Sequence, residues 1–290
     1  MSNIKASLIQ MDVAVLNSQL NLQRMCEFVR SEAKEGADLI IFPELSNTGY
    51  VEPLTPGGQI DPSLGNFEEY LHRLHAESAS VDGELVAEIT TIARQYEIYV
   101  VAGLSIRGQD LPGSLFNTCT LIGPQGLIHI YRKVHLWHCE KFYFTPGGTI
   151  AVQGTPIAQI GMQVCNDIRF PEVTRSLTLQ GAELICSVWA SSRRTSDSIS
   201  DPDLFRHRAY TRAVENGVFF LSCNRSGTQG DHTFLGRSLI VAPNGKTLAA
   251  STNEGEEVVR GQIDLTLIPI YRASVGLLSD RNPRAYYQDC

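Results

Sequence analysis

Apolar and polar residues alternate along this chain in patterns that predict strands separated by helices. Residues 4–10 alternate in the manner of a half-buried strand, and residues 37–45 form the short continuous apolar run of a strand buried on both faces. Residues 18–34 lie between them, carry apolar residues at helical spacing and are followed by Gly36, a common residue after a helix end. The first 45 residues therefore predict a strand–helix–strand unit.

The next part of the chain predicts a helix and a set of hairpin strands. Residues 46–80 are rich in Gly, Pro and Ser and are expected to be irregular. Residues 82–96 carry apolar residues on one helical face, with Asp82 as the expected N-cap. Strands are expected over residues 99–106, 116–123 and 126–134. A short Pro-Gln-Gly turn joins the last two, which predicts a hairpin.

The second half of the chain repeats this rhythm. A helix is expected to begin at Pro171, with Glu172 near the positive end of its dipole, and another is expected over residues 203–216. Strand-rich segments are residues 155–165, 182–190, 218–224, 234–251 and 256–265. Strands interleaved with helices predict a layered α/β fold, and the extra hairpins predict mixed rather than purely parallel sheets.

Composition and charge narrow the classes of protein. Residues 1–290 are 43% hydrophobic and contain no repeat, so a single domain with a large core is expected. The net charge of −7, with no basic block longer than Arg193-Arg194, argues against a nucleic-acid partner. The start lacks the layout of a signal peptide, and no run approaches the roughly 18 apolar residues of a membrane-spanning helix. We therefore expect a cytoplasmic protein with no membrane partner, in which most of the seven cysteines are small buried residues.

Three of the expected buried strands end in a chemically reactive residue. The strands lead into Glu44, Lys133 and Cys165, and the crevice beyond the carboxyl ends of strands is where open α/β sheets bind ligands. Each residue has an ordinary alternative, since a cysteine after an apolar strand is most often a core residue and a lysine most often a solvated strand end. Their chemistry is complementary, however. A cation beside a thiol favours the thiolate, and a nearby carboxylate can take the thiol proton and pass it to a leaving amine.

The motifs around these residues carry a family resemblance. The segments "FPELSNTGY", "YRKVHLW" and "CNDIRFPE" resemble the carbon–nitrogen hydrolase (nitrilase) superfamily, and "RHRAYTRAVENGVFFLSCNRSG", "GRSLIVAPNGK" and "DRNPRAYY" resemble later segments of that family. The resemblance implies a four-layer αββα sandwich with mixed sheets, no metal, no organic cofactor, and a homodimer or larger homo-oligomer.

The same resemblance implies an amide-type hydrolysis by a Glu-Lys-Cys triad. Glu44 would act as general base and acid, Lys133 as oxyanion stabiliser and Cys165 as the nucleophile that forms a thioester acyl-enzyme. A second glutamate follows the lysine in many members, and Glu140 matches that position. The candidate substrate-binding residues are Tyr50, Asn166 and Trp189, the last of which is equally typical of a core or interface aromatic.

The substrate class stays open between related alternatives. True nitrilases typically have Trp-Glu after the cysteine, where this chain has Asn166 and Asp167. N-carbamoyl amino acid hydrolases resemble Cys-Asn-Asp followed by two arginines, where this chain has Ile168 and Arg169, while "DIRFPE" is similar to omega-amidase-type enzymes. A small amide is favoured, with an N-carbamoyl (ureido) substrate as the alternative and a nitrile or a non-catalytic binding protein as less favoured ones. A zinc site in "HLWHCE" lacks a second Cys/His pair of familiar spacing.

Overall fold

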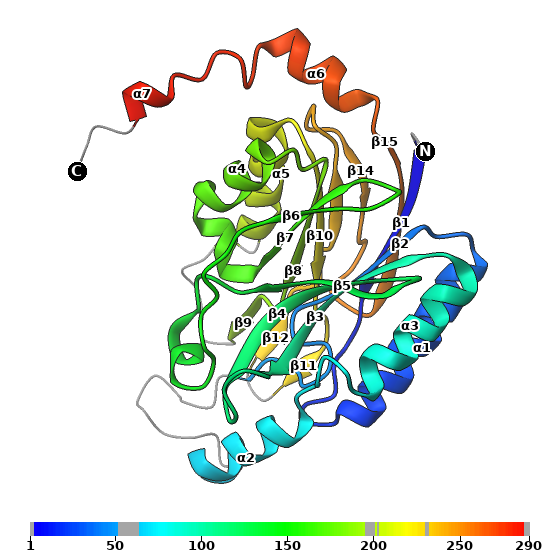
Figure 1. The fold of residues 1–290 in the computed structure, drawn as a ribbon, viewed down its shortest axis with the longest axis vertical. Helices are drawn as coiled ribbons and strands as arrows, with labels where there is room; N and C mark the ends of the chain where they lie inside the picture. The colour runs from blue at the N-terminus through cyan, green and yellow to red at the C-terminus, as the bar shows by residue number, and fades with distance from the viewer. Residues whose placement is uncertain (1–2, 52–63, 195–200, 202, 230–231, 287–290) are drawn as a thin grey trace.

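Two six-stranded sheets form the centre of the computed structural model, which describes residues 3–51, 64–194, 201, 203–229 and 232–286 (Figure 1). The first sheet has the order β15-β1-β2-β3-β4-β5. Its strands are β1 (Asn3–Gln10), β2 (Leu39–Phe42), β3 (Tyr99–Arg107), β4 (Leu115–Gly123), β5 (Gly126–Arg132) and β15 (Glu257–Asp264).

The second sheet has the order β14-β13-β10-β8-β7-β6, and a small third sheet has the order β11-β12-β9. The strands of the second sheet are β6 (Val152–Gly154), β7 (Gln159–Val164), β8 (Leu184–Trp189), β10 (Phe219–Asn224), β13 (Leu239–Val241) and β14 (Thr247–Ala250). Those of the third are β9 (Ser192–Arg194), β11 (Thr228–Gln229) and β12 (His232–Phe234).

Both large sheets are mixed, as the hairpin pattern predicts. In the first, β1, β2 and β3 are parallel, while β15, β4 and β5 add antiparallel pairings at the two sides. In the second, β7, β8 and β10 are parallel, while β6 and the β13–β14 pair are antiparallel additions. The two halves of the chain therefore build sheets of the same design.

Helices cover the outer face of each sheet, which gives the order αββα. The helices α1 (Ser18–Lys34) and α3 (Glu84–Tyr96) pack on the first sheet, in a core cluster that joins residues such as Met25 and Ile89 to Ile40. The helices α4 (Pro171–Leu179) and α5 (Leu204–Asn216) pack on the second sheet in the same way. The remaining helices are α2 (Phe67–Glu77), α6 (Leu267–Val275) and α7 (Pro283–Tyr286). The four-layer prediction is confirmed.

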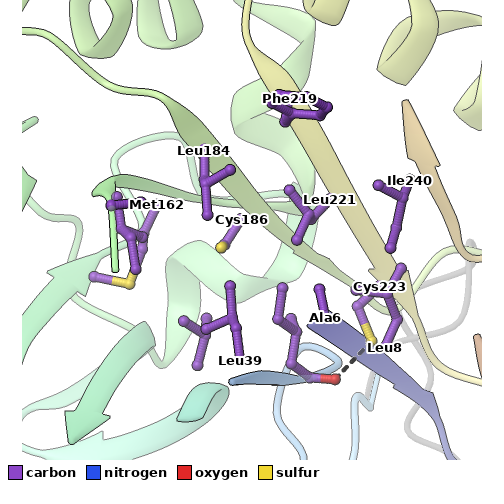
Figure 2. Close-up of a cluster of buried hydrophobic side chains, with 14 of the residues drawn as sticks. Ala6, Leu8, Leu39, Met162, Leu184, Cys186, Phe219, Leu221, Cys223 and Ile240 are labelled. Atoms are coloured by element: carbon purple, nitrogen blue, oxygen red, sulfur yellow. Dashed lines mark hydrogen bonds between the residues drawn. The ribbon is translucent and has the colours of Figure 1, made fainter. Parts of the chain in front are cut away.

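The inner faces of the two sheets share one apolar core, part of which is shown in Figure 2. Successive strand residues point to opposite faces, so alternate positions of β7 and β8 reach the inter-sheet space while those between reach the helices. Met162 and Leu184 belong to the inner cluster, whereas Ile185 belongs to the outer one. Continuous apolar strands are therefore required, and this explains the runs seen in the sequence.

Two local predictions are wrong. The segment expected to be irregular over 46–80 contains α2, which begins with a capping box in which the side chains of Asn66 and Glu69 bond each other's backbone N–H groups, at 3.0 Å each. Residues 52–63 of that segment lie outside the described residues. Asp82 is not the N-cap of α3, because its side chain accepts a hydrogen bond from Ser80 and the cap position belongs to Gly83. Among the described residues, no helix is long and apolar enough to cross a membrane.

Candidate active site

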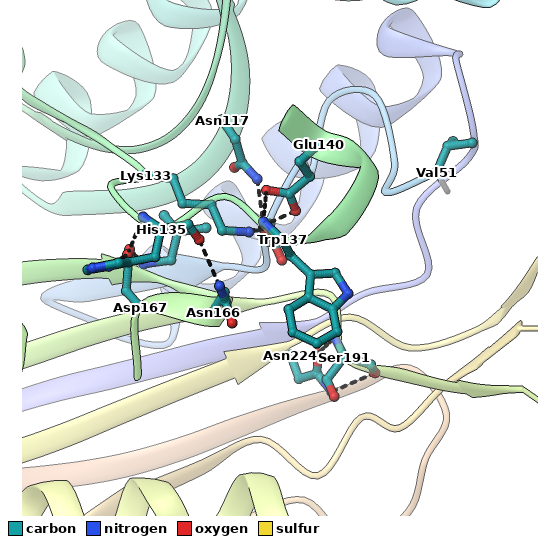
Figure 3. Close-up of polar contacts among 12 residues, drawn as sticks. Val51, Asn117, Lys133, His135, Trp137, Glu140, Asn166, Asp167, Ser191 and Asn224 are labelled. Carbon is teal, nitrogen blue, oxygen red and sulfur yellow. Dashed lines mark hydrogen bonds and ion pairs between the residues drawn. The ribbon is translucent and has the colours of Figure 1, made fainter. Parts of the chain in front are cut away.

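Three charged side chains from separate parts of the chain meet in a buried cluster. The Lys133 ammonium donates to Glu44 Oε1 at 2.7 Å and to Glu140 Oε1 at 2.8 Å, and all three side chains have 0% exposure. Figure 3 shows Lys133 and Glu140 pointing toward one another. Buried charges persist where they are paired and hydrogen-bonded, so this cluster has the form of a polar site inside an apolar fold.

Sheet topology explains how Lys133 reaches Glu44. The strand β5 runs antiparallel to β4, which runs antiparallel to β3, so β5 has the same direction as β2 and β3. The carboxyl ends of β2 and β5 therefore lie at the same edge of the sheet. Glu44 follows β2 by two residues and Lys133 follows β5 directly.

Glu140 belongs to a short 3-10 helix, η2 (His138–Phe142), that follows this strand end. Its second oxygen accepts the backbone N–H of Trp137 at 3.1 Å, which leaves Oε1 for the lysine. The carboxylate is thus held from both sides at a fixed distance from Lys133.

Close backbone contact fixes the segment that carries Glu44. Gly103 of β3 has no side chain at a point where a Cβ would lie 2.4 Å from the Pro43 carbonyl oxygen and 2.5 Å from Glu44 Cα. The Glu44 N–H donates to the Trp189 carbonyl at 3.2 Å, which links this segment to the second sheet. The next residue, Leu45, has φ 52, a left-handed conformation that turns the chain away from the strand. Gly103 is not among the residues that the sequence motifs predict for the site.

Asn117 is a site residue that the sequence motifs do not predict. Its Nδ2 donates to Glu44 Oε1 at 2.8 Å, and its backbone carbonyl accepts the Lys133 N–H at 2.8 Å. Asn117 and Lys133 both engage Oε1, and Glu44 Oε2 is buried with no hydrogen-bond partner within the described part of the chain. A free carboxylate oxygen in a polar site is an acceptor available for a proton. An amide side chain in the buried strand "LFNTCTLIG", whose other polar side chains are two threonines, is the sequence signal that points to Asn117.

Cys165 lies at a sharp turn between β7 and α4. It opens the 3-10 helix η3 (Cys165–Arg169), is partly exposed and has φ 41, in the left-handed region that non-glycine residues seldom adopt. The five other cysteines within the described residues are buried: Cys26, Cys119, Cys139, Cys186 and Cys223. The structure thus separates Cys165 from the others in both exposure and backbone conformation.

The charges of the cluster shift the pKa values of its members. Burial lowers the pKa of Lys133, but the carboxylates of Glu140 and Glu44 raise it more, so the ammonium stays protonated well above its usual range. Burial raises the pKa of Glu140 to about 7, against the opposing effect of Lys133. Burial and then the Glu44 charge raise the pKa of the Cys165 thiol, and Lys133 only partly offsets them. At neutral pH the free thiol is therefore protonated.

The three candidate substrate-binding residues lie in different surroundings. Asn166 directly follows the thiol, and its Nδ2 donates to the His135 carbonyl at 3.1 Å while its Oδ1 is buried without a partner within the described residues. Tyr50 is 7% exposed and packs in an apolar cluster beside the Glu44 segment. Trp189 is 3% exposed and packs edge-on against Phe205 at 4.3 Å between ring centroids, in the core under α5. Asn166 is the candidate nearest in sequence to the thiol.

The residues of "HLWHCE" do not gather as a metal-binding group. Within the described residues, no group of three or more His, Cys, Asp or Glu side chains is placed to hold a metal ion. His135 instead lies against Asp167, with 2.9 Å between Nδ1 and Oδ1, and its ring stacks on Phe170 at 3.8 Å. His138 stacks on Trp137 at 3.9 Å.

Comparison with known proteins gives consistent matches over nearly the whole chain. The model of the family described as carbon-nitrogen hydrolase matches residues 5–273. A Pyrococcus abyssi protein named nitrilase is 29% identical over 98% of this chain and 100% of its own length. The human protein named omega-amidase NIT2 is 27% identical over 99% of this chain and 98% of its own. The solved structure of Saccharomyces cerevisiae Nit3, described as a member of branch 10 of the nitrilase superfamily, is 25% identical with a TM-score of 0.81 and covers 98% of this chain and 97% of its own.

Proposed function

The chain belongs to the carbon–nitrogen hydrolase family, whose members act on carbon–nitrogen bonds other than peptide bonds, and on this premise we propose that it hydrolyses a small amide through Glu44, Lys133 and Cys165. One observation carries the proposal. A buried ammonium is shared by two carboxylates, all three charges act on a partly exposed thiol, and one carboxylate oxygen is left without a partner among the described residues. This arrangement supplies a nucleophile, a proton acceptor and a fixed positive charge in one place.

The proposed reaction is acyl transfer to sulfur followed by hydrolysis. Cys165 Sγ attacks the amide carbon while Glu44 Oε2 takes the thiol proton, so the S–C bond forms as the carbonyl becomes an oxyanion. The Lys133 ammonium and the backbone N–H of Asn166 stabilise that oxyanion, and one such donor is typically worth about 3–4 kcal/mol. The C–N bond then breaks, and the amine leaves with the proton from Glu44. A water molecule, deprotonated by Glu44, then attacks the thioester carbon, the C–S bond breaks to release the acid, and the sulfur takes the proton back from Glu44, while Glu140 holds Lys133 in place throughout.

The raised pKa of Cys165 determines when the thiolate forms. Because burial and the Glu44 charge disfavour the thiolate, the resting site holds a neutral thiol. Proton transfer to Glu44 then accompanies attack rather than precedes it. A thiol that is neutral at rest also reacts more slowly than a thiolate with oxidants and with unrelated electrophiles.

Two arginines near the thiol favour a substrate that carries a carboxylate. Arg169 is the last residue of η3, which begins at Cys165. The half-buried Arg208 lies on α5, one turn before Arg212. The Arg212 guanidinium donates to the Ile168 carbonyl of η3 at 2.8 Å, which places this part of α5 beside the turn that carries the thiol. Neither Arg169 nor Arg208 has an acidic partner among the residues that the structure describes. Burial and then the charges of Arg169 and Arg212 lower the pKa of Arg208, and a thiolate at the neighbouring cysteine would raise it. An anionic group on the substrate would relieve this repulsion.

Two substrate classes combine an amide-type bond with a carboxylate. Omega-amides of dicarboxylic acids are the first, and the relative named omega-amidase supports them. N-carbamoyl amino acids are the alternative, and the segment "CNDIR" of this chain, which resembles such enzymes in its first three residues, supports them. Tyr50, Asn166 and Trp189 would contact the substrate chain beyond the reacting carbon. We extend the proposal to a homodimer or larger homo-oligomer acting in the cytoplasm, with residues 1–290 as a single domain.

An ammonia-release screen tests this function. The purified protein is assayed with simple amides, omega-amides of dicarboxylic acids, N-carbamoyl amino acids and nitriles, with the Cys165→Ala variant as control. We expect release from a carboxylate-bearing amide or ureido substrate by the wild type and none by the variant. Undiminished release by Cys165→Ala would overturn the proposed mechanism, and release from nitriles alone would overturn the substrate class.

A further inference from the structure

Asp167 is a buried carboxylate whose four hydrogen bonds connect the two strand ends of the site. Its side chain has 0% exposure. Oδ2 accepts from the Tyr131 hydroxyl at 2.8 Å and from the Val164 N–H at 3.0 Å. Oδ1 accepts from the His135 N–H at 3.0 Å and lies 2.9 Å from His135 Nδ1, which donates to it as the N–H tautomer (Figure 3). Each oxygen is thus engaged twice.

The donors come from two different sheets. Tyr131 lies in β5 of the first sheet, two residues before Lys133, and His135 follows the end of that strand, two residues after Lys133. Val164 is the last residue of β7 in the second sheet and directly precedes Cys165. Asp167 therefore connects the backbone next to the lysine with the backbone next to the thiol, and it is two residues from the thiol itself.

The backbone of Cys165 needs such a restraint. A non-glycine residue at φ 41 is strained and persists only where its surroundings fix it. The bond from Val164 N–H to Asp167 Oδ2 closes the turn around Cys165, and the bond from Asn166 Nδ2 to the His135 carbonyl at 3.1 Å attaches the same turn to the lysine segment a second time. Together these bonds fix the cysteine on both sides.

We propose that Asp167 is a positioning residue that holds the Cys165 thiol at its working distance from Lys133 and Glu44. It does not touch the reacting atoms, because its oxygens are saturated by donors on the side of β5 and β7. This inference rests on the proposed function, in which the thiol and the ammonium act on the same carbonyl group. A loosened turn would separate these two groups while the binding of the rest of the substrate stays the same.

The Asp167→Asn variant tests the proposal. It keeps the shape of the side chain but replaces one acceptor oxygen with an NH₂ group, so two of the four donors lose their acceptor. We expect kcat to fall about tenfold or more while KM changes by less than about threefold, because the lost bonds to a charged group affect alignment rather than binding. Alkylation of Cys165 by iodoacetamide is expected to slow, since attack on this amide-like electrophile uses the same alignment.

Glu32→Gln is the matched control. Glu32 lies on α1, at the outer face of the first sheet, and is 1% exposed. It accepts from the Ser7 hydroxyl at 2.9 Å and from Nε and Nη2 of Arg260 at 2.7 Å each. Its substitution makes the same chemical change in a buried carboxylate outside the site. We expect Glu32→Gln to shift the urea midpoint as Asp167→Asn does, but to keep the wild-type kcat and alkylation rate.

The outcomes separate a positioning role from a structural one. A kcat and an alkylation rate in Asp167→Asn that match those of Glu32→Gln would overturn the proposal. If Asp167→Asn does not fold, Tyr131→Phe removes one donor alone and is expected to lower kcat in the same direction by a smaller factor, and an unchanged kcat there would overturn it. The alkylation rate needs no substrate turnover. Slower alkylation in a protein that releases no ammonia would therefore support the positioning role while the proposed function fails.

Discussion

Replacing Glu140 with glutamine should change how the stability of the protein depends on pH. Glu140 is fully buried, and burial raises its pKa to about 7 even though the Lys133 ammonium acts in the opposite direction. Glutamine has nearly the same shape and keeps an oxygen for Lys133, but it carries no charge at any pH. The substitution therefore removes one titrating group from the cluster and leaves the packing in place.

The sign and the size of the effect follow from linkage between protonation and folding. The folded-state pKa of about 7 lies above the ordinary value of 4.5, so between these values the folded protein holds a proton that the unfolded chain has lost. The stabilising contribution of Glu140 is thus fully present below pH 4.5 and is lost as the pH rises through 7. At about 1.4 kcal/mol per pKa unit, this difference in pKa amounts to about 3 kcal/mol of unfolding free energy.

The other groups that face Glu140 do not mask this change. They are Lys133, Glu44, Cys165, Tyr70 and Tyr143, and all of them are present in both proteins. The pKa values of the lysine, the thiol and both tyrosines are raised by their surroundings, away from the range between pH 5 and 8. A comparison of the variant with the wild type at each pH therefore measures the effect of removing this titrating carboxyl group from the cluster.

Urea unfolding at pH 5 and pH 8 measures the effect. We expect the unfolding free energy of Glu140→Gln, relative to that of the wild type, to increase by about 2.5 kcal/mol between these two pH values, because the rest of the change lies below pH 5. A relative stability that does not depend on pH, or that decreases toward pH 8, would show that Glu140 is ionised at both and that the Lys133 charge outweighs burial. Either result would refute a raised pKa of Glu140 in the folded protein.

Four further substitutions give direct tests. Cys165→Ala should abolish ammonia release with an unchanged urea midpoint, and measurable turnover would contradict the assigned nucleophile. Lys133→Ala should abolish turnover and lower the unfolding free energy by about 3–5 kcal/mol, because it leaves two buried carboxylates without a cation; equilibrium unfolding at pH 8 measures this. Asn117→Ala should lower kcat about tenfold, because a hydrogen bond to charged Glu44 is worth about 1.5–3 kcal/mol. Steady-state kinetics measures this, and an unchanged kcat would contradict a role for Asn117 in the site. Arg208→Gln should raise KM about tenfold for a carboxylate-bearing substrate and much less for a neutral amide, and an equal change for both would remove the case for an anionic substrate.

The fold was predictable from the sequence wherever a periodic pattern was long enough. The helix α1 spans residues 18–34 as predicted, because its apolar face is regular and Asn17 caps it by accepting the Leu20 N–H at 3.2 Å. The helix α2 was missed because few of its residues are buried, with Tyr70 and Leu74 fully so, and its main sequence signal is the capping box. The strands of the third sheet are two or three residues long, too short to show an alternating pattern.

The same reasoning explains which site residues the sequence revealed. Glu44, Lys133 and Cys165 each follow a buried strand, and a rule about strand ends suffices to bring them to one crevice. Asn117 and Asp167 cannot be assigned to the site in this way, because their contacts depend on the register and packing of the strands. Asn117 faces Glu44 because β4 pairs with β3, and Asp167 bonds Tyr131 in β5 and His135 just after it, both more than 30 positions away in the sequence. Sequence patterns predict which residues of a strand face the core, but contacts between sheets depend on how the sheets pack.

The charge of the cluster connects the fold to the proposed chemistry. With both carboxylates ionised, Glu44 and Glu140 carry one negative charge more than Lys133 balances, and this excess adds to burial in raising the pKa of the neighbouring thiol. The same excess supplies the acceptor for the thiol proton, since the free Oε2 of Glu44 is the unpaired atom of the cluster among the described residues. In the proposed mechanism, that proton transfer leaves Lys133 less neutralised at the moment when the oxyanion forms. The ammonium therefore interacts more strongly with the transition state than with the bound amide, and this difference is what accelerates a reaction.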